Sequence, residues 1–249
     1  MPKFFVTDRD ISDNNITIIG KDVNHIKNVL RKKVGDQLTI CNTDISLDYL
    51  CKITKIDDEK VYCNIIEKTE NNVESNIKVT IFQGLPKSDK MELVIQKSVE
   101  LGVYDITPIQ MKRCVVKLND KDKIKKIQRW QKISEVAAKQ CGRNIIPKIN
   151  NVANIKDICN LCSQYDIVLV AYENEKNNTL KEQLINVKEL NKDEIKIAII
   201  IGPEGGIAPE EIEVLKEHGT EIITLGNRIL RTETVALTVL SVIMYELEK

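Results

Sequence analysis

The stretch IIIGPEGGIAPEEIEVL, residues 199–215, decides how the C-terminal part of the chain folds. An apolar run ends at a glycine-rich turn, and a helical pattern begins a few residues later. This strand–loop–helix order is typical of an open α/β sheet, in which ligands bind at the carboxyl ends of the strands. We therefore expect the loop to face a ligand.

The composition of this loop argues against a phosphate site. A phosphate-binding loop of the P-loop type needs Lys and then Ser or Thr after its last glycine, whereas Ile207 and Ala208 stand there. Pro203 lacks an N–H group, and Glu204 repels phosphate. The loop suits a ligand of little negative charge, and the two glycines at 205–206 are expected to let the backbone approach it closely.

Strands and helices alternate on both sides of the loop. Two apolar strand runs have no polar alternation, which is typical of a parallel sheet covered on both faces. Residues 77–249 are therefore predicted to form an α/β domain. Its predicted strands cover residues 77–85, 104–109, 166–173, 195–202 and 220–226, and its predicted helices cover 88–102, 121–142 and 233–247.

A second loop, TLGNRILRTETVAL at residues 224–237, leaves another strand of this domain. Thr232 or Thr234 is expected to cap the apolar helix that follows. Arg231 either pairs with a nearby carboxylate or belongs to a ligand site that it shares with Glu204. A third strand end, VAYEN at 170–174, is expected to supply a wall of the same site. The last helix is apolar nearly all round, which fits a core or a subunit contact equally well.

Residues 1–70 have a different pattern, with short β-rich segments at 37–41, 48–56 and 60–68. One helix is predicted near residues 22–30, with Asp22 as its N-cap. A small barrel-like β domain fits these segments. The polar stretch 69–76 is expected to link the two domains.

The net charge of zero conceals an asymmetry along the chain. Residues 151–249 hold 10 Lys and Arg against 17 Asp and Glu, so the first 150 residues hold 27 against 20. The excess concentrates at residues 21–33 and 112–132, the second of which includes Trp130. Such a distribution favours contact with a polyanion, although a solvated helix face explains the first cluster as well.

The seven cysteines are an odd number scattered through a long chain, which favours reduced thiols and a cytoplasmic protein. Cys159 and Cys162 form a CxxC pair, but no second pair completes a zinc site, so we expect ordinary buried thiols and no metal. We find neither a membrane-spanning run nor a secretory signal. His25 and His218 are expected to be structural or exposed rather than catalytic.

At IGPEGG and LGNRILRTETVAL the chain closely resembles the SPOUT superfamily of RNA methyltransferases, and within it the bacterial 16S ribosomal RNA (uracil-N3)-methyltransferase family. The resemblance extends in order through residues 25–36, 84–108, 112–117 and 129–147. It implies a PUA-like RNA-binding β-barrel at 1–70 and, at 77–249, a methyltransferase domain with a deep trefoil knot, S-adenosylmethionine as methyl donor, and a homodimer. One departure is Ile207–Ala208, where an aromatic residue and a serine are expected.

The resemblance, the chemistry of the reaction it implies and the basic stretches together predict site residues. Arg231 is expected to stabilise charge on the uracil, with Thr234 as a hydrogen-bonding companion and Glu204 as a contact of the donor or, less favourably, the acceptor of the N3 proton. RNA phosphates are expected at Arg31, Arg113, Lys117, Arg129 and Arg143. The donor is expected to contact Ala171, Tyr172, Glu173, Ile201, Gly202, Pro203, Glu204, Gly205, Gly206, Leu225, Gly226, Arg228, Ile229, Leu230 and Arg231.

The reaction implied is methyl transfer to N3 of a uridine in 16S ribosomal RNA of the small subunit, without a metal. Two alternatives remain at this point: a SPOUT methyltransferase acting on tRNA or on a ribose 2′-OH, and a non-catalytic RNA-binding protein of ribosome assembly. The residues do not identify the target nucleotide or the base that takes the N3 proton.

Overall fold

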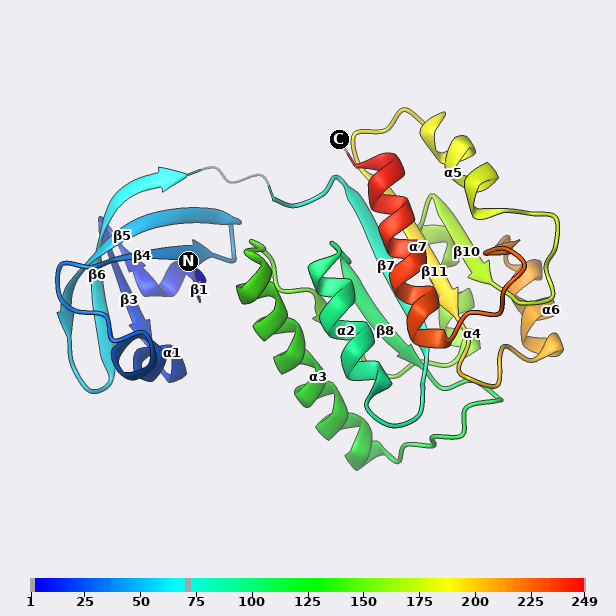
Figure 1. The fold of residues 1–249 in the computed structure, drawn as a ribbon, viewed down its shortest axis with the longest axis horizontal. Coiled ribbons are helices and arrows are strands. Elements are labelled where there is room, and N and C mark those ends of the chain that lie inside the picture. Colours follow the sequence, from blue (N-terminus) through cyan, green and yellow to red (C-terminus); the bar gives the residue numbers. More distant parts are fainter. Residues whose placement is uncertain (1–2, 70–72, 249) are drawn as a thin grey trace. The chain divides into compact units, whose positions relative to one another are not determined.

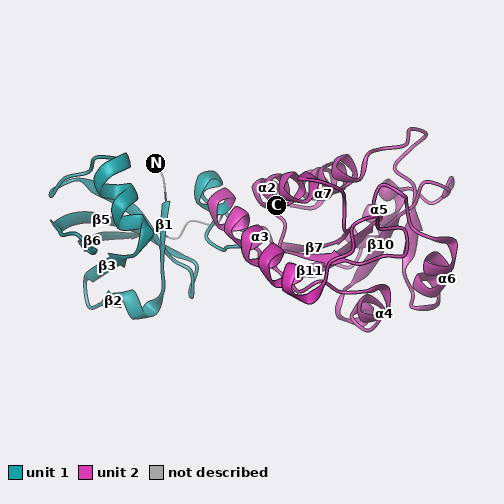
Figure 2. Cartoon of the chain, turned by 90° about the horizontal axis from the view of Figure 1, so that it is seen from below, with its two compact units in different colours: residues 1–74, 138–146 teal, residues 75–137, 147–249 magenta. Residues whose placement is uncertain are grey.

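The computed structural model describes residues 3–69 and 73–248, and the chain divides into two compact units (Figures 1 and 2). One unit comprises Met1–Glu74 with Ala138–Ile146, and the other comprises Ser75–Ala137 with Pro147–Lys249. The predicted bounds, residues 1–70 and 77–249, had assigned 138–146 to the second part. Part of the expected linker, residues 70–72, lies outside the described residues.

The first unit is a curled six-stranded sheet with the order β1-β4-β5-β6-β3-β2 (Figure 1). β1 and β4 are parallel, and the other neighbours are antiparallel. The alternation that predicted β4, β5 and β6 places one set of side chains in the core, whereas β1, β2 and β3 were not predicted. The strands are β1 (Lys3–Val6), β2 (Ile11–Ser12), β3 (Asn15–Ile19), β4 (Gln37–Asn42), β5 (Leu47–Ile56) and β6 (Lys60–Thr69).

A short helical segment completes this unit: α1 (Lys21–Asn24), followed by a π-helical turn at His25–Val29. Val23 and Ile26 are buried in the core of the unit. The expectation that Asp22 is the N-cap is wrong, because Gly20 occupies that position with φ 75°. Asp22 lies in the first turn, and its carboxylate accepts from Lys139 Nζ at 2.8 Å.

The second unit contains a parallel six-stranded sheet with the order β12-β10-β11-β7-β8-β9. The prediction of a parallel sheet is confirmed: from Ile197 to Ile201, β11 is buried at every position, so both of its faces are covered. The strands are β7 (Ile77–Gly84), β8 (Asp105–Ile109), β9 (Lys148–Ile149), β10 (Ile167–Ala171), β11 (Ile195–Ile201) and β12 (Glu221–Ile223).

Helices cover both faces of this sheet. In Figure 2, α2 and α7 lie on one face, and α4 and α6 lie on the other. The helices are α2 (Lys90–Glu100), α3 (Asp120–Cys141), α4 (Ile155–Cys159), α5 (Leu180–Lys188), α6 (Pro209–Glu217) and α7 (Thr232–Leu247). None of the helices in the described residues is long and apolar enough to cross a membrane.

The start of α7 differs from the prediction. Arg231 is the N-cap residue, without a side-chain capping bond, and Thr232 is the first residue of the helix. The Thr232 hydroxyl does not cap the helix because it donates to the carbonyl of Gly202, at 2.7 Å. The apolar pattern of the helix is explained in large part by the core, since Ala236, Leu240 and Ile243 are buried.

Candidate functional site

A cavity of about 520 Å³ lies at the carboxyl ends of β10, β11 and β12. The loops that follow these three strands form most of its wall. β10 is the middle strand of the three, so the segment after Ala171 separates the loop at 202–206 from the loop at 225–231. The structure places around this one cavity every residue predicted to contact the donor.

The glycines of the 202–206 loop are required by packing within the protein. A Cβ on Gly202 would lie 2.9 Å from Ile207 Cγ1, and one on Gly205 would lie 3.2 Å from Arg113 Cβ. On Gly206, where φ is +70°, a Cβ would lie 2.4 Å from a carboxylate oxygen of Glu173. Atoms of Ile207, Arg113 and Glu173 therefore stand where these Cβ atoms would lie, and the close approach of the backbone at 205–206 to a ligand stays a prediction.

Ile207, the departure from the family pattern, is buried within this turn. Ala208 is the N-cap of α6 and has no side-chain acceptor for the helix N–H groups. Glu211 compensates in part, because its carboxylate accepts the Ala208 N–H at 3.1 Å. The departure thus affects the start of α6.

A buried hydrogen-bond chain joins β7, the 202–206 loop and α7. Gln83 is fully buried, and its Nε2 donates to Thr232 Oγ1 at 2.8 Å. Since the hydroxyl of Thr232 accepts this bond, its own proton is directed to the Gly202 carbonyl. Gly84, the next residue of β7, packs closely on the same loop, because a Cβ there would lie 2.7 Å from the ring of Pro203. These contacts fix the floor of the cavity.

Glu204 is held by the start of α2 rather than facing the cavity as a free carboxylate. It accepts the Lys87 N–H at 3.0 Å and pairs with Lys90 Nζ at 3.0 Å. Lys90 also lies 3.4 Å from a carboxylate oxygen of Glu233 in the first turn of α7. One cation thus connects two acidic side chains on two different elements at the edge of the cavity.

The pKa values in this group follow from the contacts. Burial tends to raise the pKa of Glu204, but the backbone N–H of Glu204, Lys90 and the Lys87 N–H lower it below its usual range. The hydrogen bond to Glu204 raises the pKa of Lys90, with Glu233 adding to the effect and partial desolvation opposing it. Both groups therefore stay charged at neutral pH, and Glu204 is a weak proton acceptor.

Lys90, Gln83 and Thr232 were not among the predicted site residues. A lysine at the first position of a helix opposes the helix dipole, so the place of Lys90 is a local signal present in the sequence. Gln83 had no such signal, because only the pairing of β7 with β11 brings it beneath the loop.

Arg231 lines the cavity with an exposed side chain, and among the described residues no carboxylate pairs with it. This favours the ligand-site alternative over the ion-pair alternative. Arg228 lines the same cavity and is also exposed. Thr234 is exposed on α7 and does not line the cavity, whereas Thr232 does.

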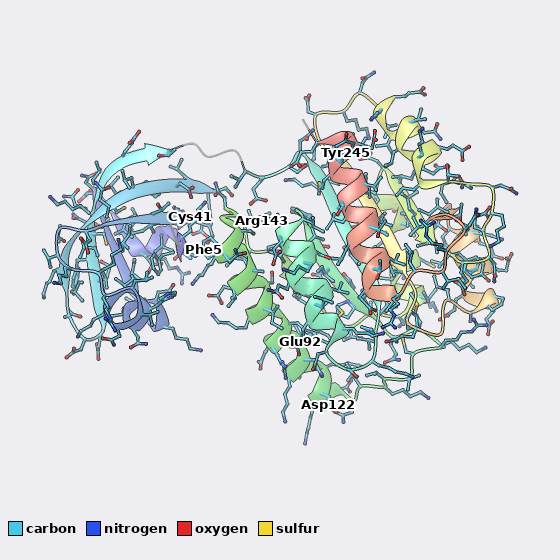
Figure 3. The ribbon with its side chains drawn as sticks, in the orientation of Figure 1. Phe5, Cys41, Glu92, Asp122, Arg143 and Tyr245 are labelled. Carbon is cyan, nitrogen blue, oxygen red and sulfur yellow. The ribbon has the colours of Figure 1, made fainter. Side chains whose placement is uncertain are left out.

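The five residues predicted to contact RNA have different environments. Lys117 and Arg31 are exposed, and Arg129 is exposed but pairs at 2.7 Å with Glu92. Glu92 lies on α2, where Figure 3 labels it. The prediction that Arg143 contacts RNA is corrected by the structure. Arg143 is 6% exposed, and its guanidinium pairs with Glu74 at 2.6 Å, so its charge is already compensated.

The 112–132 cluster also differs from expectation. Trp130 is 3% exposed, so its ring is packed in the protein rather than available to a base. Arg113 is exposed, and its Nη1 donates to the carbonyl of Gly205 at 3.1 Å. This part of the basic surface therefore reaches the loop that lines the cavity.

The remaining titratable candidates lie elsewhere. His218 caps α6, with Nδ1 2.8 Å from the Val214 carbonyl, and His25 packs edge-on against Phe4. Cys159 and Cys162 are free thiols, both buried, and burial raises the pKa of each, as expected for unreactive cysteines. In the part of the chain that the structure describes, no group of three or more His, Cys, Asp and Glu side chains is placed to hold a metal ion.

Two family models match this chain. The RNA methyltransferase domain model matches residues 73–244, and the RNA methyltransferase PUA domain model matches residues 18–66. Ribosomal RNA small subunit methyltransferase E of Bacillus subtilis is 39% identical over 100% of this chain and 98% of its own. The protein of the same name from Mesomycoplasma hyopneumoniae is 35% identical, over 97% of this chain and 98% of its own.

Two solved structures of methyltransferases show the same fold with a bound ligand. One, from Legionella pneumophila in complex with the cofactor SAM, is 31% identical with a TM-score of 0.85, over 98% of this chain and 96% of that one. The other, a ribosomal RNA small subunit methyltransferase E from Neisseria gonorrhoeae bound to S-adenosyl methionine, is 26% identical with a TM-score of 0.84, over 98% and 97%.

Proposed function

Because the chain belongs to the ribosomal RNA small subunit methyltransferase E family of RNA methyltransferases, we propose that it methylates N3 of a uridine in 16S ribosomal RNA, with S-adenosylmethionine as the donor. The observation that carries this proposal is the cavity at the ends of β10, β11 and β12, where an exposed arginine, Arg231, stands among the loops.

The cavity fits the donor in size. Its volume of about 520 Å³ lies within the range of small-molecule sites. Glu173 contributes an acidic group to its wall that suits the sulfonium or ammonium of the donor, whereas the charge of Glu204 is already paired with Lys90. Pro203 and Glu204 make the same loop a poor phosphate site. The two relatives with bound S-adenosylmethionine support this choice of ligand.

The residues of this chain contribute mainly by positioning and by electrostatics. When bound, the donor supplies an electrophilic methyl group on sulfur. The N3–C bond forms as the C–S bond breaks, and N3 must also lose its proton. The resulting negative charge spreads onto O2 and O4 of the uracil, and Arg231 is the cation at the cavity that we assign to stabilise it.

We assign Glu204 to holding the loop rather than to accepting the N3 proton. Its carboxylate is already bonded to the Lys87 N–H and to Lys90 Nζ, and these contacts keep its pKa low. A carboxylate stabilised in this way is a weak base. Its contact with the donor then comes through the backbone of the loop.

The homodimer and the C-terminal trefoil knot implied by the resemblance belong to the same proposal. The side of α7 that carries Ser241 and Tyr245 is exposed, and Tyr245 is 87% exposed (Figure 3). We expect a second copy to cover this side. Sedimentation equilibrium of the purified protein should give twice the mass of the chain, and a monomer would contradict the dimer without affecting the proposed reaction.

Mass spectrometry of nucleosides tests the reaction. A strain without the gene should lack 3-methyluridine in 16S ribosomal RNA, and the purified protein with S-adenosylmethionine should restore it on small subunits from that strain. An unchanged level of 3-methyluridine would reject this reaction. Loss of a tRNA or ribose 2′-O-methyl mark instead would point to another substrate, and absence of donor binding would point to a non-catalytic RNA-binding protein.

A further inference from the structure

The loop between β8 and α3, at residues 110–119, is basic and packs on the donor loop at 202–206. Arg113 Nη1 donates to the Gly205 carbonyl at 3.1 Å. The next contacts fix the start of α6: the Lys112 N–H donates to Glu211 at 2.9 Å, and Lys112 Nζ bonds to Glu210. One bond therefore joins the basic loop to the loop that lines the cavity, and two more join it to the first turn of α6, which follows that loop.

The fit between these two loops is close at the backbone level. A Cβ on Gly205 would lie 3.2 Å from both Cβ and the carbonyl oxygen of Arg113. The main chains of the two loops are thus in direct contact. A displacement of Arg113 would therefore change the position of Gly205, whose neighbours Glu204 and Gly206 also line the cavity.

Arg113 has capacity for a second partner. A guanidinium has five N–H donors in a fixed, planar arrangement. Among the described residues, the Gly205 carbonyl is the only hydrogen-bond acceptor that this side chain meets, and the side chain is exposed. One guanidinium can therefore bind the carbonyl and an RNA phosphate at the same time, and a lysine ammonium cannot present the same two-sided geometry.

Building on the proposed function, we infer that Arg113 is a positioning residue that couples RNA binding to donor binding. A phosphate bound to the outer donors of the guanidinium restrains the group that holds the Gly205 carbonyl, and so restrains the donor loop. By linkage, a donor that orders this loop must strengthen RNA binding by the same factor. The enzyme then binds its donor most tightly when RNA is present.

The test is equilibrium dialysis of radiolabelled S-adenosylhomocysteine, which cannot transfer a methyl group, with and without saturating small ribosomal subunits from the strain that lacks the gene. For the wild-type protein we expect RNA to lower the Kd of this ligand about five-fold or more, the lower end of typical coupling factors. In Arg113→Met the ratio of the two Kd values should approach one.

Two further variants separate coupling from charge and from folding. Arg113→Lys keeps the cation, so RNA affinity should stay close to wild type while the ratio still falls towards one. Arg129→Met removes a cation of the same basic stretch that pairs with Glu92 and does not contact the loop, so RNA affinity should fall while the ratio is kept. Thermal unfolding of each variant checks that it is folded.

Full coupling in both Arg113 variants, or no coupling in the wild type, would overturn the inference. The proposed function is judged separately, because methylation of the same subunits by the wild-type protein is measured in the same preparation. A protein that methylates without coupling rejects only the role of Arg113. A protein that binds neither ligand rejects the proposed function.

Discussion

Arg231 connects the loop after β12 to α7, and its backbone already belongs to the helix start, where its carbonyl accepts the Val235 N–H at 2.9 Å. The backbone is therefore fixed by the helix, while the side chain is exposed at the cavity. This combination suits a group that must present a positive charge at a defined place. Its removal should affect the reaction more than the fold.

We expect Arg231→Ala to lower kcat by about 100- to 1000-fold, the loss typical for removal of one donor that stabilises a developing oxyanion. Binding of S-adenosylmethionine, measured by calorimetry, should change little. Arg228→Ala is the matched control, since it removes the same charge from the same loop. Methylation by Arg231→Ala at the wild-type rate would exclude Arg231 from the mechanism.

The pKa shifts of Lys90 and Glu204 predict the pH range over which both groups stabilise the donor site. The pKa of Glu204 is lowered. The stabilisation of the donor site by the Glu204 carboxylate is therefore present above about pH 4.5 and is lost as the pH falls through the folded-state pKa. The pKa of Lys90 is raised, so the stabilisation of the donor site by the Lys90 ammonium is lost only as the pH rises above about 10.5. The contributions of Glu204 and Lys90 to donor affinity should therefore be nearly constant from about pH 6 to about pH 9.

Lys90→Met should shift the acid limit of this range. Without the cation, the carboxylates of Glu204 and Glu233 lose their shared partner, and the pKa of Glu204 should rise. Donor affinity, followed by calorimetry, should weaken at neutral pH, and its loss on acidification should begin at a higher pH than in the wild type. Lys97→Met removes an ion-paired lysine from the same helix and should leave the profile unchanged.

At the scale of elements, the turns that end the strands are shaped by their neighbours. Gly206 and Gly219 have nearly the same backbone conformation, with φ of +70° and +74°, but only Gly206 has a side chain, Glu173, close to the position of a Cβ. Gly219 has open space there. Substitutions at these two glycines therefore separate the effect of a positive φ from the effect of contact with Glu173.

Both Gly206→Ala and Gly219→Ala should lose about 1 kcal/mol of stability because alanine disfavours positive φ. Only Gly206→Ala should also weaken donor binding, because the new methyl group pushes the Glu173 carboxylate away from the cavity wall. Denaturant unfolding and calorimetry measure the two effects. Equal donor affinity in the two variants would show that the position of Glu173 does not matter for the donor.

At the scale of the whole molecule, the segment 138–146 is held in the first unit by buried polar contacts. Lys3 Nζ donates to Asp48 at 2.7 Å and to Asn144 Oδ1 at 2.6 Å. Glu74 pairs with Arg143 and accepts the Asn144 N–H at 2.8 Å. These contacts explain why a segment expected to belong to the second domain belongs to the first.

Glu74→Gln should destabilise the first unit by about 3–5 kcal/mol, the loss typical for breaking a buried ion pair, because it removes the carboxylate charge that pairs with Arg143. Burial tends to raise the pKa of Glu74, but Arg143 and the N–H groups of Asn144 and Ile145 lower it overall. The wild type should therefore lose this contribution as the pH falls below about 4.5, and the variant should not.

Urea unfolding at neutral and acidic pH measures both effects. Glu67→Gln, at an exposed position on β6, is the control and should change stability by less than about 0.5 kcal/mol. A Glu74 variant as stable as the Glu67 variant at neutral pH would mean that the buried pair contributes nothing to stability.

The sequence by itself determined most of the elements and the composition of the cavity wall. Apolar runs without alternation predicted β10 and β11, and glycine turns marked the loops that follow β11 and β12. These signals are local, since a strand, a turn and a helix start each depend on a few consecutive residues. In a parallel sheet the carboxyl ends of the strands lie at one edge, so the loops at 202–206 and 225–231 were expected at the same edge. The strand order, which places only β10 between β11 and β12, brings them to one cavity.

Only the tertiary structure decided which partners the polar side chains have. Glu204 bonds to a residue 117 positions away, and Arg143 bonds to Glu74 across 69 positions. The sequence marks both as charged residues near a turn or a helix end, but it does not show whether a charge meets RNA, a donor or another side chain. Strand order and packing bring these distant residues together, and so they decided that Arg143 is a structural residue and Lys90 a site residue.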